Sequence, residues 1–141
     1  MGVDKTVIER VEVDEGGDGE RGACVVAHVR PARGARCRCG VCQRRCGRYD
    51  LGEGRRRWRA LDAGTVQVFL EADAPRVRCR EHGVVVAHVP WARHGAGHTL
   101  VFDETVAWLV TQCSKTAVTE LMRIAWRTVG APRRRAHPGL R

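Results

Sequence analysis

The stretch CRCGVCQRRC, residues 37–46, contains four of the seven cysteines in a chain of 141 residues. Within it, Cys39 and Cys42 have the C-x-x-C spacing at which two thiolates on one tight turn occupy two corners of a tetrahedron. Gly40 gives such a turn the backbone freedom that it needs. An odd number of cysteines and an N-terminus without a secretory signal disfavour a disulfide framework. These residues therefore predict half of a metal site.

A second half-site lies in CREH, residues 79–82, where Cys79 and His82 are again separated by two residues. The two pairs stand 36 residues apart, and this pattern predicts two turns that converge on one zinc ion. Zinc would also stabilise a β unit that buries too little apolar surface to be stable alone. The predicted zinc ligands are Cys39, Cys42, Cys79 and His82.

The other cysteines have weaker claims to a metal. An iron–sulfur cluster on residues 37–46 alone is a rival ligand set, but one spacing in that run is wrong and CREH would have no role. Cys37 and Cys46 are interpreted as surface thiols, with substitution for a zinc ligand as the open alternative. Cys24, in a strand pattern, and Cys113, on an apolar helical face, are assigned to the core.

Short β-branched segments dominate the first ninety residues. The first two segments, separated by a loop rich in glycine and acidic residues, read as a hairpin. The segment ADAP, residues 72–75, is expected to be a turn between the third and fourth strands. The predicted strands are residues 6–12, 24–29, 65–71, 75–79 and 84–90.

The pattern changes at WARHGAGH, residues 91–98, which has two glycines and no periodicity and is interpreted as a solvated linker that includes His94 and His98. A first helix follows, with Asp103 and Glu104 in the first turn, where the helix dipole favours anions. Its apolar residues recur at helical spacing and define one face. They are Phe102, Val106, Leu109, Val110 and Cys113.

Ser114 is expected to cap a second helix over residues 115–123. The apolar residues of this helix that share a face are Ala117, Val118, Leu121 and Met122. A third helix should begin at Trp126 and end before Pro132, because an interior proline removes a backbone donor. Three short helices with tight connections are typical of a helix-turn-helix DNA reader.

These elements predict an α+β fold in which an N-terminal β-rich zinc-ribbon-like module is followed by a small three-helix helix-turn-helix unit. The predicted division is a β-hairpin at 1–35, the zinc-ribbon-like module at 36–90, the linker at 91–98, the helix-turn-helix at 99–131 and a disordered basic tail at 132–141.

Charge points to a polyanionic partner. The formal net charge is +9, and all but two of the 25 basic residues are arginine, the side chain suited to bidentate contact with phosphates and guanine edges. Eleven arginines lie within residues 28–59 and six within residues 121–141. The most direct partner is double-stranded DNA. No apolar run is long enough to span a membrane, so we expect a cytoplasmic protein without a membrane partner.

The order of several blocks resembles the N-terminal region of insertion-sequence transposases of the ISL3 family. These blocks are the C-x-x-C knuckle, YDLGEGRRRWRALDAGTVQVFL, PRVRCREHG, VPWARHGAGHT and SKTAVTELMRIAWRTVG. The resemblance covers roughly residues 36–130 and implies a zinc finger, with His82 in place of a commoner cysteine, followed by a helix-turn-helix that binds the terminal inverted repeats of the element. Oligomerisation with a full-length transposase is a further expectation.

The residues expected to contact DNA are Arg55, Arg56, Arg57, Lys115, Arg123, Trp126, Arg127, Thr128, Arg133, Arg134 and Arg135. Trp126, Arg127 and Thr128 would begin the recognition helix, and the arginine clusters would neutralise phosphates in a salt-dependent way.

Two departures from the family matter. The family continues into a ribonuclease-H-like domain whose acidic triad binds two metal ions, whereas this sequence has no carboxylate after Glu120. A truncated fragment without enzymatic activity is therefore expected. In addition, APRRRAHPGLR, residues 131–141, breaks with the family and shortens the recognition helix. Two alternatives stay open, namely a free-standing zinc-ribbon and helix-turn-helix regulator of transcription, and an RNA-binding or protein-binding zinc module.

Overall fold

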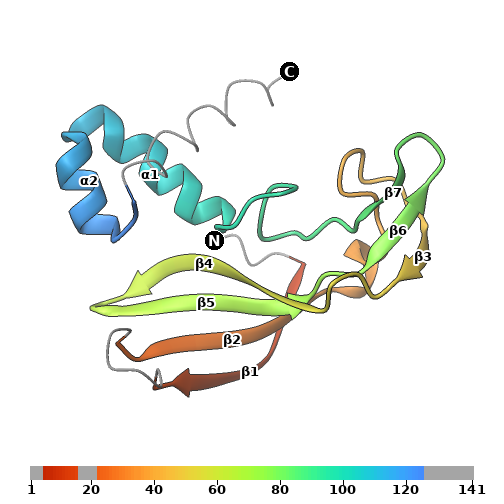
Figure 1. Ribbon diagram of the computed structural model, residues 1–141, viewed down its shortest axis with the longest axis horizontal. Helices are drawn as coiled ribbons and strands as arrows, with labels where there is room; N and C mark the ends of the chain where they lie inside the picture. The colour runs from red at the N-terminus through yellow and green to blue at the C-terminus, as the bar shows by residue number, and fades with distance from the viewer. Residues whose placement is uncertain (1–4, 16–21, 126–141) are drawn as a thin grey trace. The chain divides into compact units, whose positions relative to one another are not determined.

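The first two strands form the hairpin that the sequence predicts. The computed structural model describes residues 5–15 and 22–125. Strand β1 (Thr6–Asp14) pairs antiparallel with β2 (Cys24–Pro31), as Figure 1 shows. β2 then pairs in parallel with β5 (Val66–Asp73), which pairs antiparallel with β4 (Arg55–Ala63). The result is a four-stranded sheet in the order β1-β2-β5-β4.

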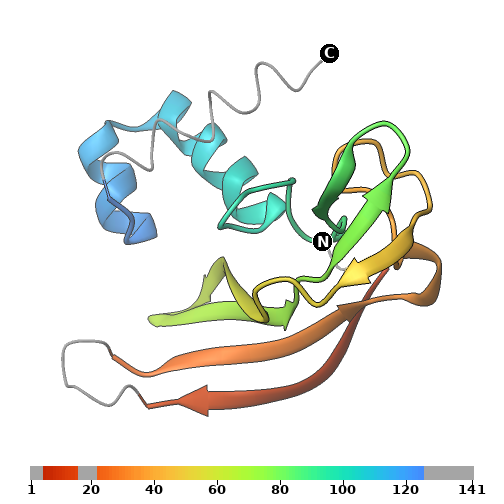
Figure 2. The same cartoon turned by 45° about the vertical axis from the view of Figure 1, so that its right-hand side comes forward.

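A second, smaller sheet has three antiparallel strands in the order β3-β6-β7. Its members are β3 (Gly47–Asp50), β6 (Arg76–Cys79) and β7 (Gly83–Val86), and a short 3-10 helix, η1 (Arg33–Ala35), precedes them. Figure 2 shows the β6–β7 hairpin with β3 beside it. We call residues 33–54 and 75–86, which contain η1 and this sheet, the ribbon.

Strands β3 and β4 were not predicted from the sequence. Two of the features that were predicted also differ from the structure. The last predicted strand ends at Val86 rather than at residue 90, because Val89 leaves the sheet and enters the core. ADAP, predicted to be a turn, contains the last two residues of β5 and connects this strand to β6 in the other sheet.

The predicted boundary at residue 35 also differs from the structure. β2, from the expected separate hairpin, pairs with β5, from the expected zinc-ribbon module. The four-stranded sheet therefore crosses that boundary, and residues Met1–Thr99 form one compact unit.

The core of this unit is built around two tryptophans. The rings of Trp58, from β4, and Trp91 lie 5.3 Å apart at 78°, an edge-to-face arrangement that aromatic quadrupoles favour. Both side chains are almost fully buried. The other buried members of the cluster are Ala27, Val29, Ala72, Val89 and Ala92.

The segment 91–98 is therefore packed, and its interpretation as a solvated linker was wrong. Its backbone is tied to β4, since the Arg59 amide donates to the Gly97 carbonyl at 2.9 Å and the Thr99 amide donates to the Arg59 carbonyl at 2.9 Å. The Arg56 guanidinium lies over the Trp58 ring at 4.9 Å and donates to the Ala96 carbonyl at 2.6 Å.

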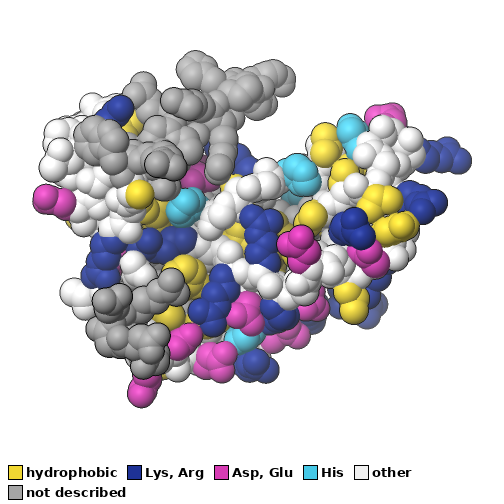
Figure 3. All heavy atoms as spheres, in the orientation of Figure 1, with side chains coloured by type: hydrophobic (Ala, Val, Ile, Leu, Met, Phe, Trp, Pro, Cys, Tyr) yellow, Lys and Arg dark blue, Asp and Glu magenta, His cyan; other side chains and the backbone are white. Residues whose placement is uncertain are grey.

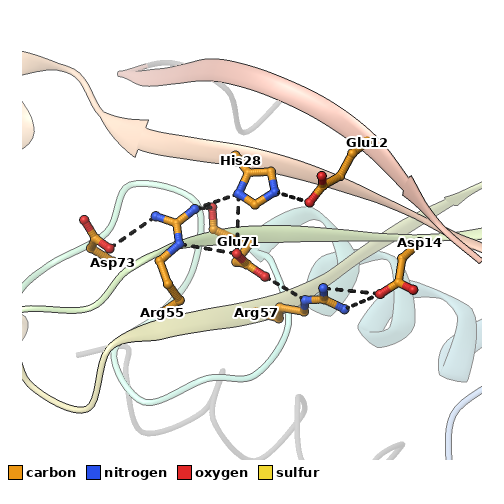
Figure 4. Close-up of polar contacts among 7 residues, drawn as sticks. All are labelled: Glu12, Asp14, His28, Arg55, Arg57, Glu71 and Asp73. Carbon is orange, nitrogen blue, oxygen red and sulfur yellow. Dashed lines mark hydrogen bonds and ion pairs between the residues drawn. The ribbon is translucent and has the colours of Figure 1, made fainter. Parts of the chain in front are cut away.

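Basic and acidic side chains alternate over the four-stranded sheet (Figure 3), and several of them form one network (Figure 4). Glu71 lies at its centre and accepts from Arg57 at 2.9 Å and from Arg55 at 3.3 Å. His28, almost fully buried, contacts Glu12 through Nε2 at 2.6 Å and Arg55 through Nδ1 at 2.7 Å. Further ion pairs join Arg55 to Asp73 and Arg57 to Asp14.

This network predicts acid sensitivity. The hydrogen bond from Arg57, with that from Arg55, holds the pKa of Glu71 below its usual range. A carboxyl group whose pKa is lowered by folding adds stability above its unfolded pKa, about 4.3, and loses it as pH falls through the lower folded value. Glu71→Gln should therefore have a lower free energy of unfolding than the wild type at pH 7. In urea unfolding experiments, the difference in free energy of unfolding between the two proteins should become smaller below pH 4.

Zinc-binding thiolates also take up protons in acid. The role of Glu71 is therefore read from the difference in free energy of unfolding between the two proteins at each pH, and not from the pH dependence of either protein alone. A gap that stays constant from pH 7 to pH 3 would contradict the role given to this carboxylate.

The second unit, Leu100–Arg141, is described as far as residue 125. It contains α1 (Leu100–Gln112) and α2 (Lys115–Met122). Their shared core consists of Phe102, Val106, Leu109, Val118 and Met122. The expected α+β class is confirmed, with two helices in the described residues; the third helix predicted from Trp126 lies outside them. No helix in the described part of the chain is both long and apolar enough to cross a membrane.

Three positions assigned to the apolar faces of these helices are exposed. They are Cys113, Ala117 and Leu121. Cys113 lies beyond the last residue of α1, and the contact between α1 and α2 runs through Val118 and Met122 instead.

The predicted cap is confirmed, because the Ser114 hydroxyl accepts from the Ala117 amide at 3.1 Å. Ser114→Ala leaves that amide without its partner and should destabilise α2 by about 1 kcal/mol. Faster amide hydrogen exchange in residues 116–119 would report the loss. Ser114→Asp, which retains an acceptor, should keep the wild-type exchange rates, and equal rates in the alanine variant would show that the cap contributes nothing.

Candidate metal centre and nucleic-acid interface

The first turn of the centre is closed by backbone pairing within the cysteine-rich stretch. Arg38 and Arg45 form an antiparallel bridge, and inside it the Cys39 amide donates to the Arg44 carbonyl at 2.9 Å. The Val41 amide points at the Cys39 sulfur, 3.4 Å away. A side chain at Gly40 would meet the Val86 carbonyl oxygen at 2.5 Å, so only glycine fits where this turn approaches β7.

The second turn is the tip of the β6–β7 hairpin. Cys79 is the last residue of β6 and pairs with Gly83, the first of β7. Gly83 has φ +71°, a left-handed conformation that glycine adopts without strain. His82 occupies the turn between them and turns its Nδ1 toward Cys79. Arg44, from the first turn, forms an ion pair with Glu81 of the second at 3.2 Å.

The two turns bring together the four residues predicted from spacing. The ligand atoms of Cys39, Cys42, Cys79 and His82 all lie within 4.8 Å of one another. His82 Nδ1 is 3.5 Å from Cys79 Sγ and 3.6 Å from Cys39 Sγ, and the Cys42 and Cys79 sulfurs are 3.8 Å apart. Zinc bonds of ordinary length in a tetrahedron separate sulfur from nitrogen by about 3.6 Å and two sulfurs by about 3.8 Å. The donor atoms therefore fit a tetrahedral zinc ion.

The thiols of this cluster differ in acidity. Hydrogen bonds from the His82 backbone and side chain lower the pKa of Cys79 to about 6. A hydrogen bond from the Arg44 backbone acts in the same direction on Cys42, but burial and the neighbouring thiols outweigh it and raise the pKa of Cys42. At neutral pH Cys79 is therefore mainly a thiolate, whereas Cys42 releases a proton when it binds a metal ion.

The other cysteines are not part of this cluster of four. Cys46 is half-buried, its thiol donates to the Arg44 carbonyl at 3.1 Å, and burial followed by the nearby Cys79 charge raises its pKa. Cys37 is half-buried at the other end of the same bridge, where its carbonyl accepts from the Cys46 amide at 2.8 Å. The alternative iron–sulfur site made of residues 37–46 alone is not supported, because Cys39 and Cys42 cluster with Cys79 and His82.

The basic residues predicted to contact DNA lie in different surroundings. The guanidinium groups of Arg55 and Arg57 are engaged by carboxylates, and that of Arg56 packs on Trp58. Sequence reasoning could count these charges but could not see that each has a partner inside the protein.

Lys115, in the first turn of α2, and Arg123, which follows it, are exposed. The predicted contacts that lie outside the described residues are Trp126, Arg127, Thr128, Arg133, Arg134 and Arg135.

Two family models match the chain. One, a zinc-finger of transposase IS204/IS1001/IS1096/IS1165, covers residues 35–82. The other, a helix-turn-helix domain of transposase family ISL3, covers residues 87–131. The first match contains both halves of the cysteine and histidine cluster, and the second contains α1 and α2.

Curated relatives agree with these models. The chain is 63% identical over 132 residues to the transposase for insertion sequence element IS1557 of Mycobacterium tuberculosis, in strains CDC 1551 / Oshkosh and ATCC 25618 / H37Rv. The alignment covers 93% of this chain and 30% of each relative. No solved structure gives a significant match.

Proposed function

We propose that this chain, which carries the zinc-finger and helix-turn-helix regions of ISL3-family transposases, recognises the terminal inverted repeats of an insertion sequence in double-stranded DNA. The observation that carries the proposal is the joint presence of a transposase zinc-finger region and a transposase helix-turn-helix region in one chain, matched at residues 35–82 and 87–131. The 63% identity to the IS1557 transposase indicates which kind of element supplies the DNA.

In this proposal Cys39, Cys42, Cys79 and His82 hold the zinc ion. When bound, zinc cross-links the turn at residues 39–42 to the β6–β7 turn and so fixes the ribbon. The protein contributes the orientation of the donors, since the Val41 amide points at the Cys39 sulfur and the Arg44–Glu81 pair joins the two turns from outside.

Sequence recognition is assigned to the helical unit. α1 and α2 form the first part of a helix-turn-helix, and the segment from Trp126 is proposed to enter the major groove, with Arg127 and Thr128 against base edges. Lys115, Arg123 and the arginines at 133–135 are proposed to contact phosphates, which position the protein without reading sequence.

We also propose that the chain does not cleave DNA by itself. Strand cleavage by two metal ions needs a cluster of carboxylates that are free to bind hard cations. Within the described residues, the central carboxylate of the sheet, Glu71, is engaged by arginines, and the metal-ligand cluster is made of thiols and imidazole, which suit zinc. Association with a full-length transposase and a cytoplasmic location stay predictions; co-elution in size-exclusion chromatography would test the first.

The proposal is tested by fluorescence anisotropy with two duplexes of equal length, one carrying a terminal inverted repeat of IS1557 and one its scrambled sequence. The zinc-loaded chain should prefer the repeat, and each substituted base pair at a contacted position should cost about 1–3 kcal/mol. Equal affinity for both duplexes at every salt concentration would contradict recognition of the element ends.

A further inference from the structure

The positive charge of the β-rich unit is concentrated in the ribbon. The other described residues of this unit, 5–15, 22–32, 55–74 and 87–99, contain eight basic and seven acidic residues, whereas the ribbon has nine arginines and three acidic residues. Figure 3 shows the dark blue arginines over the β3-β6-β7 region. The ribbon is therefore the part of this unit that attracts polyanions.

Ion pairing increases the contrast. Arg55, Arg57 and Arg59 of β4 each have a carboxylate partner. Among the described residues, the ion pairs of ribbon arginines are those of Arg44 with Glu81 and of Arg76 with Asp50. The exposed ribbon arginines for which the described residues provide no carboxylate partner are Arg33, Arg36, Arg45, Arg48, Arg78 and Arg80.

Strand β6 arranges part of this charge in a row. Because side chains alternate along a strand, Val77 and Cys79 point inward and are buried, while Arg76 and Arg78 point outward; the exposed Arg80 follows in the turn. The repeat from Arg76 to Arg78 along the strand is about 7 Å. The outer face of the ribbon therefore carries arginines that are close neighbours in the chain.

An aromatic ring orders this row. Tyr49, in the irregular part of β3 that pairs with β6, is 47% exposed. The Arg78 guanidinium lies 5.0 Å from the centroid of its ring and the Arg76 guanidinium 5.3 Å. Arg76 is neutralised by Asp50, so Arg78 is held in place by a cation–π contact while its charge stays available.

We propose that the outer face of β6, where Tyr49 orders Arg78, together with the exposed Arg80 that follows the strand, binds the phosphate backbone of duplex DNA as a second contact apart from the helix-turn-helix. The proposal rests on the proposed function for the presence of DNA. Phosphate is the fitting ligand because guanidinium groups bind it bidentately. Arginines on a short exposed strand, without a helix to enter a groove, would position the DNA without reading its sequence.

The test uses the full zinc-loaded chain and the salt dependence of duplex binding. Arg78→Gln with Arg80→Gln should reduce the slope of log K against log salt by about 1.8, since each phosphate contact contributes about 0.9. The matched control, Lys5→Gln with Arg10→Gln, removes the same charge from exposed residues outside the ribbon and should leave the slope unchanged. Zinc content and the unfolding midpoint should match the wild type in both double variants.

Tyr49 provides a second measurement. Tyr49→Leu removes the ring that orders Arg78 and should weaken binding to all duplexes alike, whereas Tyr49→Phe keeps the ring and should bind as the wild type does. Equal slope changes in the two double variants would show that only net charge matters and would overturn the proposal. Displacement of the DNA by polyglutamate at matched charge concentration would also overturn it, because the face would then bind acidic protein equally well.

The outcomes separate this proposal from the proposed function. If the chain prefers the inverted repeat but the Arg78/Arg80 double variant has the wild-type salt slope, the proposed ribbon contact is wrong and the proposed function stands. If the double variant has a smaller salt slope but the chain binds both duplexes equally well, the ribbon contact is supported and recognition of the element ends is contradicted.

Discussion

A Cys79→Ala variant should bind no stoichiometric zinc and should lose the folded ribbon, while the wild type retains one zinc ion per chain in native mass spectrometry. Cys79 is buried at the end of β6, and its sulfur lies 3.8 Å from Cys42 Sγ and 3.5 Å from His82 Nδ1. Structural zinc in small modules supplies about 10–16 kcal/mol of apparent binding free energy at pH 7. A unit of this size has no comparable source of stability to replace it.

The matched control is Cys46→Ala, which removes a neighbouring thiol that lies outside the cluster of four. This variant should keep its zinc and the far-ultraviolet circular dichroism of the wild type. Treating the wild type with a chelator should reproduce the spectrum of Cys79→Ala. Zinc retained at one ion per chain in Cys79→Ala, or lost in Cys46→Ala, would require a different ligand set.

The ligand pairs could be predicted because each lies on one turn. C-x-x-C and C-x-x-H spacing depends on local backbone geometry, and the glycines at 40 and 83 are the residues that these turns need. That the two pairs meet depends on the pairing of β3, β6 and β7, and β3 was not predicted. The cluster was found without this knowledge because zinc chemistry limits the ways in which thiols and imidazole combine.

Strand β4 was missed because its sequence, RRRWRALDA, looks like a solvated basic run. Its side chains do alternate between two faces, but arginines lie on both. Arg55 and Arg57 form ion pairs with carboxylates on one face, and Arg56 packs on Trp58 on the other. Sequence patterns treat arginine as exposed and cannot anticipate such tertiary partners. The expectation that these three arginines contact DNA stays a prediction.

The segment 91–98 was misjudged for a related reason. Glycines at 95 and 97 and the absence of periodicity are typical of linkers, but packing is decided by partners distant in sequence. Trp91 reaches Trp58, 33 positions earlier in the chain, and only the folded sheet brings them together.

Trp91→Ala should therefore be far more destructive than a substitution in a linker. The side chain is 2% exposed, and removal of a buried tryptophan typically costs about 3–5 kcal/mol. The variant loses the edge-to-face contact with Trp58 and leaves a cavity beside β4. Urea unfolding of the zinc-loaded protein should show the loss, and amide exchange should accelerate at Arg59 and Thr99, whose hydrogen bonds tie the segment to β4.

Trp108→Ala is the matched control, since this tryptophan is 62% exposed on α1 and its removal should change stability by less than about 0.5 kcal/mol. If the two variants lost equal stability, the burial of Trp91 would not be what holds the segment. If only Trp91→Ala is destabilised, residues 91–98 act as a structural part of the β-rich unit. In that case an insertion within them should damage zinc retention as well as stability, because β7 leads directly into this segment from the Cys79–His82 turn.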